Sequence, residues 1–106
     1  MNSKSKISIV MSAKDAQRTI TDSINSILLQ SYNNFELLIM DDASTDNTAE
    51  IISQFAAKDS RVKIFTNKIN LGLTASLNIL IKNSSGEFIA RQDSDDVSFP
   101  ERLKNQ

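Results

Sequence analysis

Short apolar runs alternate with segments of helical periodicity along the chain, and this alternation constrains the fold more than any other feature. Four runs rich in apolar and β-branched residues predict strands, at 7–11, 35–40, 62–66 and 87–92. Three intervening segments carry apolar side chains at helical spacing, beginning near residues 19, 48 and 73. This order is typical of parallel βαβ units with helices on both faces of a sheet. We predict an α/β fold, a Rossmann-like three-layer sandwich with a mainly parallel sheet.

The ends of two helices can also be predicted. Thr19 and Asp22 fit a capping box at the start of the first helix, with Asp in place of the usual Glu. Residues 100–106 resemble the beginning of a helix that starts at Pro100, and the chain ends inside it. We therefore expect residues 1–106 to be a single domain that is incomplete at its C-terminus, with uncovered apolar surface that favours self-association.

Several function classes are excluded by composition. The chain has no cysteine and no histidine, so its chemistry must come from carboxylates, hydroxyls, amides, Lys or Arg. With 12 basic and 13 acidic residues the net charge is -1, which gives no electrostatic footprint for nucleic acid. No apolar stretch approaches the ~20 residues of a membrane helix, and we expect a cytoplasmic location.

Acidic residues gather after two of the predicted strands. Six of the 13 acidic residues lie in the segments 41–46 and 93–96. In parallel sheets ligands bind beyond the carboxyl ends of the strands, where these segments are expected. Like charges so close raise one another's pKa unless a cation neutralises them, and hard oxygen ligands suit Mg²⁺ or Mn²⁺. A divalent ion is the expectation.

Plainer explanations exist for both acidic segments. Asp, Ser, Thr and Asn in 41–46 are preferred helix-capping residues. Residues 93–96 could form a solvated loop before a helix. Neither segment completes an EF-hand calcium loop, which needs Gly at its sixth position and Glu at its twelfth. Only Gly72 and Gly86 are present, so no glycine-rich loop can hold a diphosphate, and a metal would have to neutralise it.

The chain resembles the amino-terminal, nucleotide-sugar-binding half of a family 2 glycosyltransferase with the GT-A architecture. The resemblance covers nearly the whole chain and rests on these segments in order: 7–15, 30–36, 41–48, 70–78, 86–96 and 100–103. It implies a nucleoside-diphosphate sugar as the ligand, and a UDP-sugar is the preferred candidate. The whole enzyme is then expected to transfer the sugar with inversion to a saccharide or lipid-linked acceptor, in surface polysaccharide synthesis at the cytoplasmic face of the membrane.

The resemblance assigns nucleotide-binding roles to two segments near strand ends. Asp42 is expected to accept a hydrogen bond from the base, while the loop at Ser12 and Ala13 packs on the base or ribose. Asp15 belongs to the same loop. Family members commonly have Pro-x-Tyr-Asn here, and the absence of that aromatic side chain is expected to weaken nucleotide binding by about 1 kcal/mol.

The resemblance also implies a metal site after the fourth predicted strand. Asp93 would contact the ribose or the metal, Ser94 would contribute to nucleotide-sugar binding, and Asp95 would coordinate Mn²⁺ or Mg²⁺ bridging the diphosphate. Asp96 is given a supporting or structural role. Arg91 is one candidate for additional positive charge at the diphosphate, and Lys14 after the first strand is the other. The catalytic base of the family is expected beyond Gln106, so none is assigned.

Two other classes remain as alternatives. A sugar-phosphate nucleotidyltransferase also combines such a sheet with carboxylate-bound metal, but it tends to use a glycine-rich basic loop after the first strand, and residues 12–18 contain no glycine. A receiver-like signalling domain that binds Mg²⁺ would account for Asp41 and Asp42 but would leave residues 93–95 unexplained.

Overall fold

The protein is described by a computed structural model, which covers residues 5–104. Its elements are β1 (Ile7–Ala13), α1 (Ile20–Leu28), β2 (Phe35–Asp42), α2 (Thr48–Lys58), β3 (Val62–Asn67), α3 (Leu73–Lys82) and β4 (Phe88–Arg91). All strand pairs are parallel and the strand order is β3-β2-β1-β4. The predicted α/β class and the order of the elements are confirmed. None of the described helices is long and apolar enough to span a bilayer.

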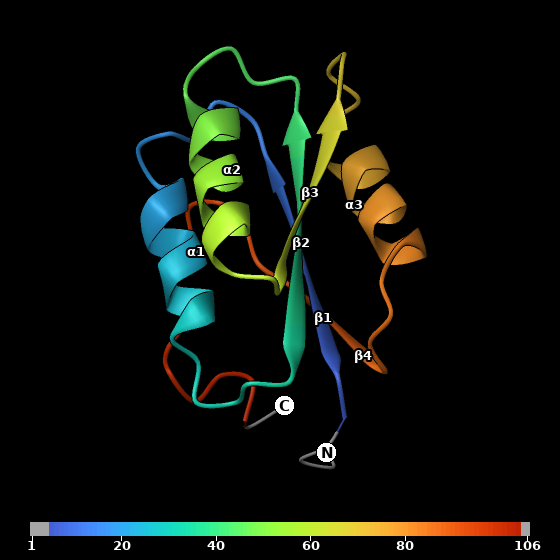
Figure 1. Cartoon of the computed structure of the whole chain (residues 1–106). Coiled ribbons are helices and arrows are strands. Elements are labelled where there is room, and N and C mark those ends of the chain that lie inside the picture. Colours follow the sequence, from blue (N-terminus) through green and yellow to red (C-terminus); the bar gives the residue numbers. More distant parts are fainter. Residues whose placement is uncertain (1–4, 105–106) are drawn as a thin grey trace.

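Helices cover both faces of the sheet, which gives the predicted three layers. Figure 1 shows α1 and α2 on one face and α3 on the other. Successive strand residues point to opposite faces, so Ile9 belongs to the cluster with α1 and α2, whereas Val10 packs with Leu80 of α3. Strand β2 is buried along its whole length because it lies inside the sheet. Strand β4 lies at an edge, and its Phe88 and Ile89 are about half exposed.

Two predictions about helix ends are wrong. Thr19 precedes α1, but its side chain forms no capping hydrogen bond, because its hydroxyl points back to the carbonyl of Ala16 at 3.5 Å. Residues 100–104 form turns rather than a helix. The carbonyl of Pro100, which a helix would need, instead accepts hydrogen bonds from the N–H (2.8 Å) and hydroxyl (3.1 Å) of Ser31. The predicted helix residues 105–106 lie outside the described part.

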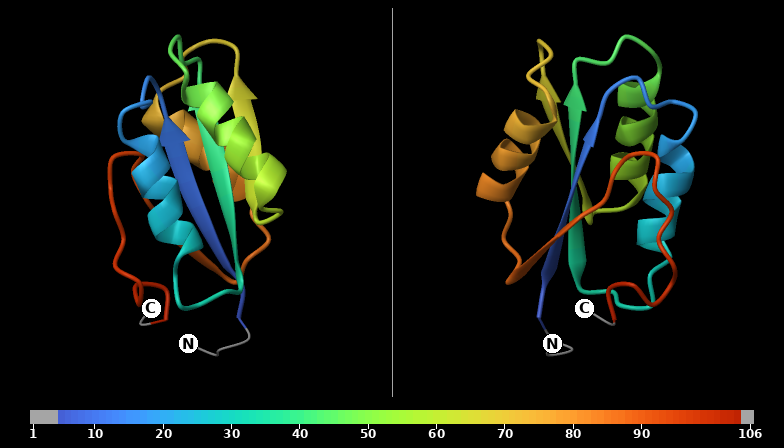
Figure 2. Two further views of the ribbon diagram at one scale, coloured as in Figure 1. Left: turned by 60° about the vertical axis from the view of Figure 1, so that its left-hand side comes forward. Right: turned by 180° about the vertical axis from the view of Figure 1, so that it is seen from behind.

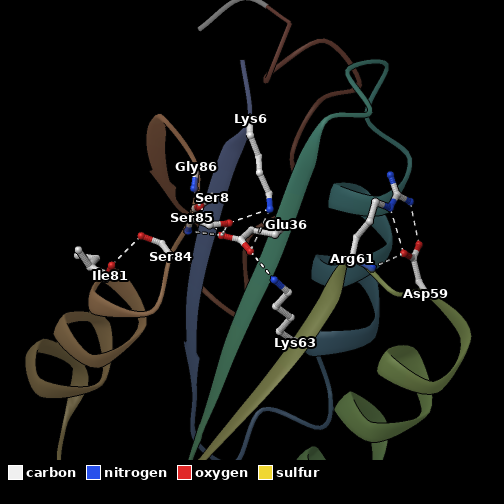
Figure 3. Close-up of polar contacts among 10 residues, drawn as sticks. All are labelled: Lys6, Ser8, Glu36, Asp59, Arg61, Lys63, Ile81, Ser84, Ser85 and Gly86. Carbon is white, nitrogen blue, oxygen red and sulfur yellow. Dashed lines mark hydrogen bonds and ion pairs between the residues drawn. The ribbon is translucent and has the colours of Figure 1, made fainter. Parts of the chain in front are cut away.

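A buried charged cluster holds the amino ends of the strands together (Figure 3). The carboxylate of Glu36 is only 2% exposed and accepts hydrogen bonds from the Ser8 hydroxyl (2.6 Å), the Lys63 ammonium (2.7 Å) and the Ser85 N–H (2.7 Å). The Lys6 ammonium lies 3.5 Å away. Burial raises the pKa of Glu36, but the hydrogen bonds from Lys63, Ser8 and Ser85 lower it more, to about 2. The cluster thus joins β1, β2, β3 and the segment before β4 around one ionised carboxylate.

The turn before β4 fits against this cluster only because residue 86 is glycine. The Gly86 N–H donates to the Ser8 hydroxyl at 2.8 Å. A Cβ at residue 86 would lie 2.6 Å from the Ser8 backbone nitrogen and 2.9 Å from the carbonyl oxygen of Lys6. Any other residue would therefore push the turn away from β1.

Candidate functional site

The carboxyl ends of the strands lie at one edge of the sheet, and the candidate site residues lie there. Strands β2 and β3 follow on one side of β1 and β4 lies on its other side, so the direction of the strand order reverses between β1 and β4. Ligands of open parallel sheets bind at such a reversal. The N–H of Gln92 donates to the carbonyl of Val10 at 3.1 Å, so the segment after β4 begins directly beside β1. The fold thus brings the acidic segment 93–96 next to the end of β1.

The acidic loop, residues 93–96, gathers three carboxylates. One carboxylate oxygen from each of Asp93, Asp95 and Asp96 lies within 4.8 Å of the others, with Asp95 and Asp96 exposed. Ser94 lies in the turn between the first two and is partly buried. Arg91 pairs with Asp93, its Nη2 being 2.9 Å from Oδ1. Asp96, expected to have only a supporting role, contributes the third carboxylate. Oxygen donors of this kind suit Mg²⁺ or Mn²⁺, so the residues fit the predicted ion.

Asp42 is buried and already engaged with the loop after β3. Its side chain accepts hydrogen bonds from the Asn67 amide (3.0 Å) and from the N–H groups of Leu71 (2.8 Å) and Gly72 (2.9 Å). Burial raises the pKa of Asp42, but the donors Leu71, Asn67 and Gly72 and the charge of Lys14 lower it more, so the pKa lies below its ordinary value. A carboxylate has about four acceptor positions, and these hydrogen bonds use three of them. Contact with a base stays a prediction.

The loop after β1 is tied to the loop after β2. Ala13 is buried and Ser12 partly buried at the end of β1. Asp15 has a φ of 50° and donates its N–H to the Ser44 hydroxyl at 3.0 Å. Its carboxylate accepts the N–H of Thr45 at 2.7 Å. Asp15 therefore joins the two loops, and its predicted contact with nucleotide stays a prediction.

In the first acidic segment, residues 41–46, two of the aspartates accept hydrogen bonds from the chain itself. Asp41 accepts the N–H of Ser44 at 3.1 Å, and Asp46 accepts the N–H of Thr48 at 2.9 Å. The hydroxyl and N–H of Thr48 and the N–H of Gln17 lower the pKa of Asp46 instead of raising it. Asp46 therefore binds Thr48, the first residue of α2, but the N-cap of that helix is Asn47 and has no side-chain capping hydrogen bond, so the capping alternative is not confirmed. Among the described residues, only the acidic loop presents three carboxylates close enough for one ion.

Sequence reasoning missed two buried polar residues, Glu36 at the amino ends of the strands and Gln92 beside the acidic loop. Glu36 lies within an apolar strand, and a lone charge in such a run is itself a signal that a partner is nearby. Gln92, which is 2% exposed, follows β4 and contacts α1. Its sequence context carries no comparable signal, because its partners in α1, Ser23 and Ser26, lie 69 and 66 residues away in the chain.

The parallel sheet with an acidic loop at its reversal point defines a GT-A type domain. The chain belongs to glycosyl transferase family 2, whose sequence profile matches residues 8–106. This membership decides against the nucleotidyltransferase and receiver alternatives.

Relatives of this chain agree with that assignment. A Bacillus subtilis (strain 168) protein named as a glycosyltransferase, EpsE, is 51% identical over 107 residues, which is 100% of this chain and 38% of the relative. The Escherichia coli UDP-Glc:alpha-D-GlcNAc-diphosphoundecaprenol beta-1,3-glucosyltransferase WfgD is 43% identical over 100 residues, which is 94% of this chain and 39% of the relative. The chain thus spans about two fifths of the length of these relatives.

Solved structures share the fold. Residues 1–349 of S. aureus TarS, determined alone and in complex with UDP-GlcNAc, match with a TM-score of 0.88 and 31% identity, over 94% of this chain. The match covers 30% of the TarS chain solved alone. The Pyrobaculum calidifontis mannosyltransferase PcManGT, in complex with GDP-Man and Mn2+, has a TM-score of 0.82 at 21% identity over 91% of this chain and 29% of its own, and shows the fold alone.

Proposed function

We propose that residues 1–106 form a donor-binding domain that holds a nucleoside-diphosphate sugar through a divalent ion. A UDP-sugar is the preferred candidate. The observation that carries this proposal is the cluster of three carboxylates at the point where the strand order reverses. Family membership supports the class of reaction, and the carboxyl edge of the sheet is the proposed place of binding. The name of WfgD specifies UDP-Glc, and TarS has been solved with UDP and with UDP-GlcNAc, which supports uridine nucleotides.

Asp93 and Asp95 are the proposed ligands of Mn²⁺ or Mg²⁺, with Asp96 as the nearest further carboxylate. When bound, the ion supplies positive charge that neutralises the diphosphate and favours its departure. Arg91, held beside Asp93 by their ion pair, adds a cation at the same edge. The complex of PcManGT with GDP-Man and Mn2+ is consistent with this choice of ion.

The nucleotide is proposed to lie across the ends of β1 and β2. Asp42 has one acceptor position left for an N–H of the base, and its three internal hydrogen bonds fix the carboxylate in place. Ser12 and Ala13 would pack on the base or ribose, with Asp15 in the same loop and Ser94 near the sugar diphosphate. A fixed acceptor suits recognition because little side-chain freedom is lost on binding.

For the whole protein we propose transfer of the sugar, with inversion, to a saccharide or lipid-linked acceptor in surface polysaccharide synthesis, at the cytoplasmic face of the membrane. The name of WfgD specifies a diphosphoundecaprenol-linked acceptor, which supports the lipid-linked class. Within residues 5–104 we assign no general base. The chemistry that the described residues account for is therefore donor binding and stabilisation of the leaving diphosphate.

Calorimetric titration with UDP, GDP and dTDP, with and without Mn²⁺, tests the proposal. We expect UDP to bind only with the metal, and Asp95→Ala to reduce this affinity at least about 10-fold, as loss of a metal ligand should. Glu101→Ala is the control, because it removes an exposed carboxylate outside the acidic loop. Metal-independent binding of UDP, or an unchanged affinity in Asp95→Ala, would contradict the proposed metal site.

A further inference from the structure

Gln92 lies buried between the end of β4 and α1, where it contacts both α1 and the acidic loop. Its Nε2 is 3.1 Å from the carbonyl oxygen of Ser23 in α1 and 3.2 Å from the carbonyl oxygen of Asp96. Its Oε1 accepts hydrogen bonds from Arg102 Nη1 at 2.8 Å and from the hydroxyl of Ser98. One amide therefore links a helix, the acidic loop and the segment that follows the loop.

Two serines of α1 also bind the acidic loop and the segment that follows it. The hydroxyl of Ser23, which is fully buried, donates to the carbonyl of Asp93 at 3.0 Å. The hydroxyl of Ser26 accepts the N–H of Ser98 at 3.0 Å. Figure 2 shows the segment after β4 running beside α1 toward the C-terminus. The helix thus binds the loop at its first residue, Asp93, and the chain just beyond the loop at Ser98.

These contacts reach the acidic loop through its backbone, and none of them uses a carboxylate of the loop. The bonds from Ser23 and Gln92 end on the carbonyls of Asp93 and Asp96. The carboxylate of Asp95 has no hydrogen-bond partner within the described chain, and that of Asp96 accepts only the N–H of Asp93, at 3.3 Å. Three like charges repel one another, so the attached backbone helps to keep them within 4.8 Å, together with the Arg91–Asp93 ion pair and the N–H of Asp93 that binds Asp96.

We propose that Gln92, with Ser23 and Ser26, is a positioning residue that fixes the acidic loop through its backbone so that its carboxylates are arranged for the ion in advance. This inference rests on the proposed metal site. Glutamine suits the position because its amide supplies two N–H donors for carbonyls and one acceptor for Arg102. A glutamate would present no donor to the carbonyls of Ser23 and Asp96.

Gln92→Met is the central variant, because methionine is similar in length and removes all the polar contacts. Gln30→Met is the matched control. Gln30 is also buried, and its amide binds the carbonyl of Phe99 (2.7 Å) and the N–H of Leu103 (3.0 Å), beyond the acidic loop. Gln30→Met removes hydrogen bonds to Ser26, Phe99 and Leu103, which are fewer contacts than Gln92→Met removes, so thermal unfolding is needed to compare the two losses of stability. The two variants differ in whether the acidic loop is attached.

Three readouts separate positioning from general stabilisation: Mn²⁺ affinity from the free-ion EPR signal with saturating UDP, amide hydrogen exchange at residues 93–98, and thermal unfolding. We expect Gln92→Met to weaken Mn²⁺ about 10-fold, the lower end for residues that orient metal ligands, and to accelerate exchange at 93–98. Gln30→Met should leave Mn²⁺ affinity within about 2-fold, the scale of ordinary context effects. Equal Mn²⁺ affinities in the two variants would overturn the inference.

Ser23→Ala provides a milder test should Gln92→Met fail to fold, because it removes the hydroxyl contact to Asp93 and keeps the helix. We expect it to weaken Mn²⁺ and to accelerate exchange at 93–98, by less than Gln92→Met. Wild-type protein that binds neither Mn²⁺ nor UDP would contradict the proposed function, and exchange at 93–98 would still decide whether Gln92 fixes the loop. Unchanged exchange in Gln92→Met or in Ser23→Ala would overturn the positioning role.

Discussion

Acidic side chains have opposite environments at the two ends of the sheet. At the amino end, the Glu36 carboxylate is buried and bound by Lys63, Ser8 and Ser85 (Figure 3). At the carboxyl end, Asp95 is exposed and unpaired within the described chain, and two further carboxylates lie beside it. The first carboxylate is neutralised by the protein itself and stabilises the fold. In the second group Asp93 pairs with Arg91, whereas Asp95 keeps its charge available for a ligand.

Asp42 lies between these extremes and shows how one strand serves both purposes. It is buried like Glu36 and lies at the other end of β2. Its donors are an amide and two backbone N–H groups rather than ammonium groups, and it keeps one free acceptor position. A buried carboxylate can thus be held in place by neutral donors, and its remaining acceptor position is the one that we propose for a base.

The largest effect on stability is expected at the amino end. Glu36→Gln removes the charge that faces Lys63 and Lys6, and we expect it to lower the free energy of unfolding by about 2 kcal/mol because a buried, hydrogen-bonded ion pair is broken. Urea unfolding measures the change, with Glu50→Gln at an exposed position as the control. A loss no larger than that of the control would mean that the cluster is not a stabilising centre.

The same carboxylate should make stability depend on pH. The folded pKa of about 2 lies below the ordinary value of 4.5, so the contribution of Glu36 is present above pH 4.5 and is lost as the pH falls toward 2. In urea titrations from pH 5 to 2.5, the stability gap between wild type and Glu36→Gln should narrow steadily. A gap that stays constant over this range would contradict the lowered pKa.

A smaller effect is expected at the carboxyl edge from Gly72→Ala. Gly72 has a φ of 89°, and a Cβ there would meet no atom within 4 Å, so the substitution introduces backbone strain without a clash. We expect a loss of about 1 kcal/mol in unfolding free energy. Faster amide exchange at Leu71 and Gly72 should accompany it, because their N–H groups bind Asp42. Unchanged exchange at both residues would mean that their hydrogen bonds to Asp42 do not depend on the backbone conformation of Gly72.

The smallest effect on stability is expected for Asp95→Asn. The side chain is exposed and has no partner in the described chain, and it stands among like charges. Its substitution should change the unfolding free energy by less than about 0.5 kcal/mol, or raise it slightly by relieving repulsion. Thermal unfolding without metal provides the measurement. A loss of unfolding free energy as large as that expected for Glu36→Gln would mean that Asp95, like Glu36, stabilises the fold.

Much of the fold and part of the site follow from the local sequence. Apolar periodicity located the four strands and three helices, and turn-forming acidic residues after buried strands indicated where a ligand edge would lie. Strand ends were predicted less well. Strands β1 and β2 run on to Ala13 and Asp42 because their neighbours continue the parallel ladder there, and that pairing depends on residues far along the chain.

The sequence by itself determined the class of fold, the order of its elements and the position of the acidic loop, because these depend on periodicity and on residue type over short spans. Only the tertiary structure decided which carboxylates are neutralised. Glu36 meets Ser8, Lys63 and Ser85, and Gln92 meets Ser23, through crossovers that bring distant segments together. A hydrogen-bond partner is fixed by where the chain returns in space, which no local pattern records.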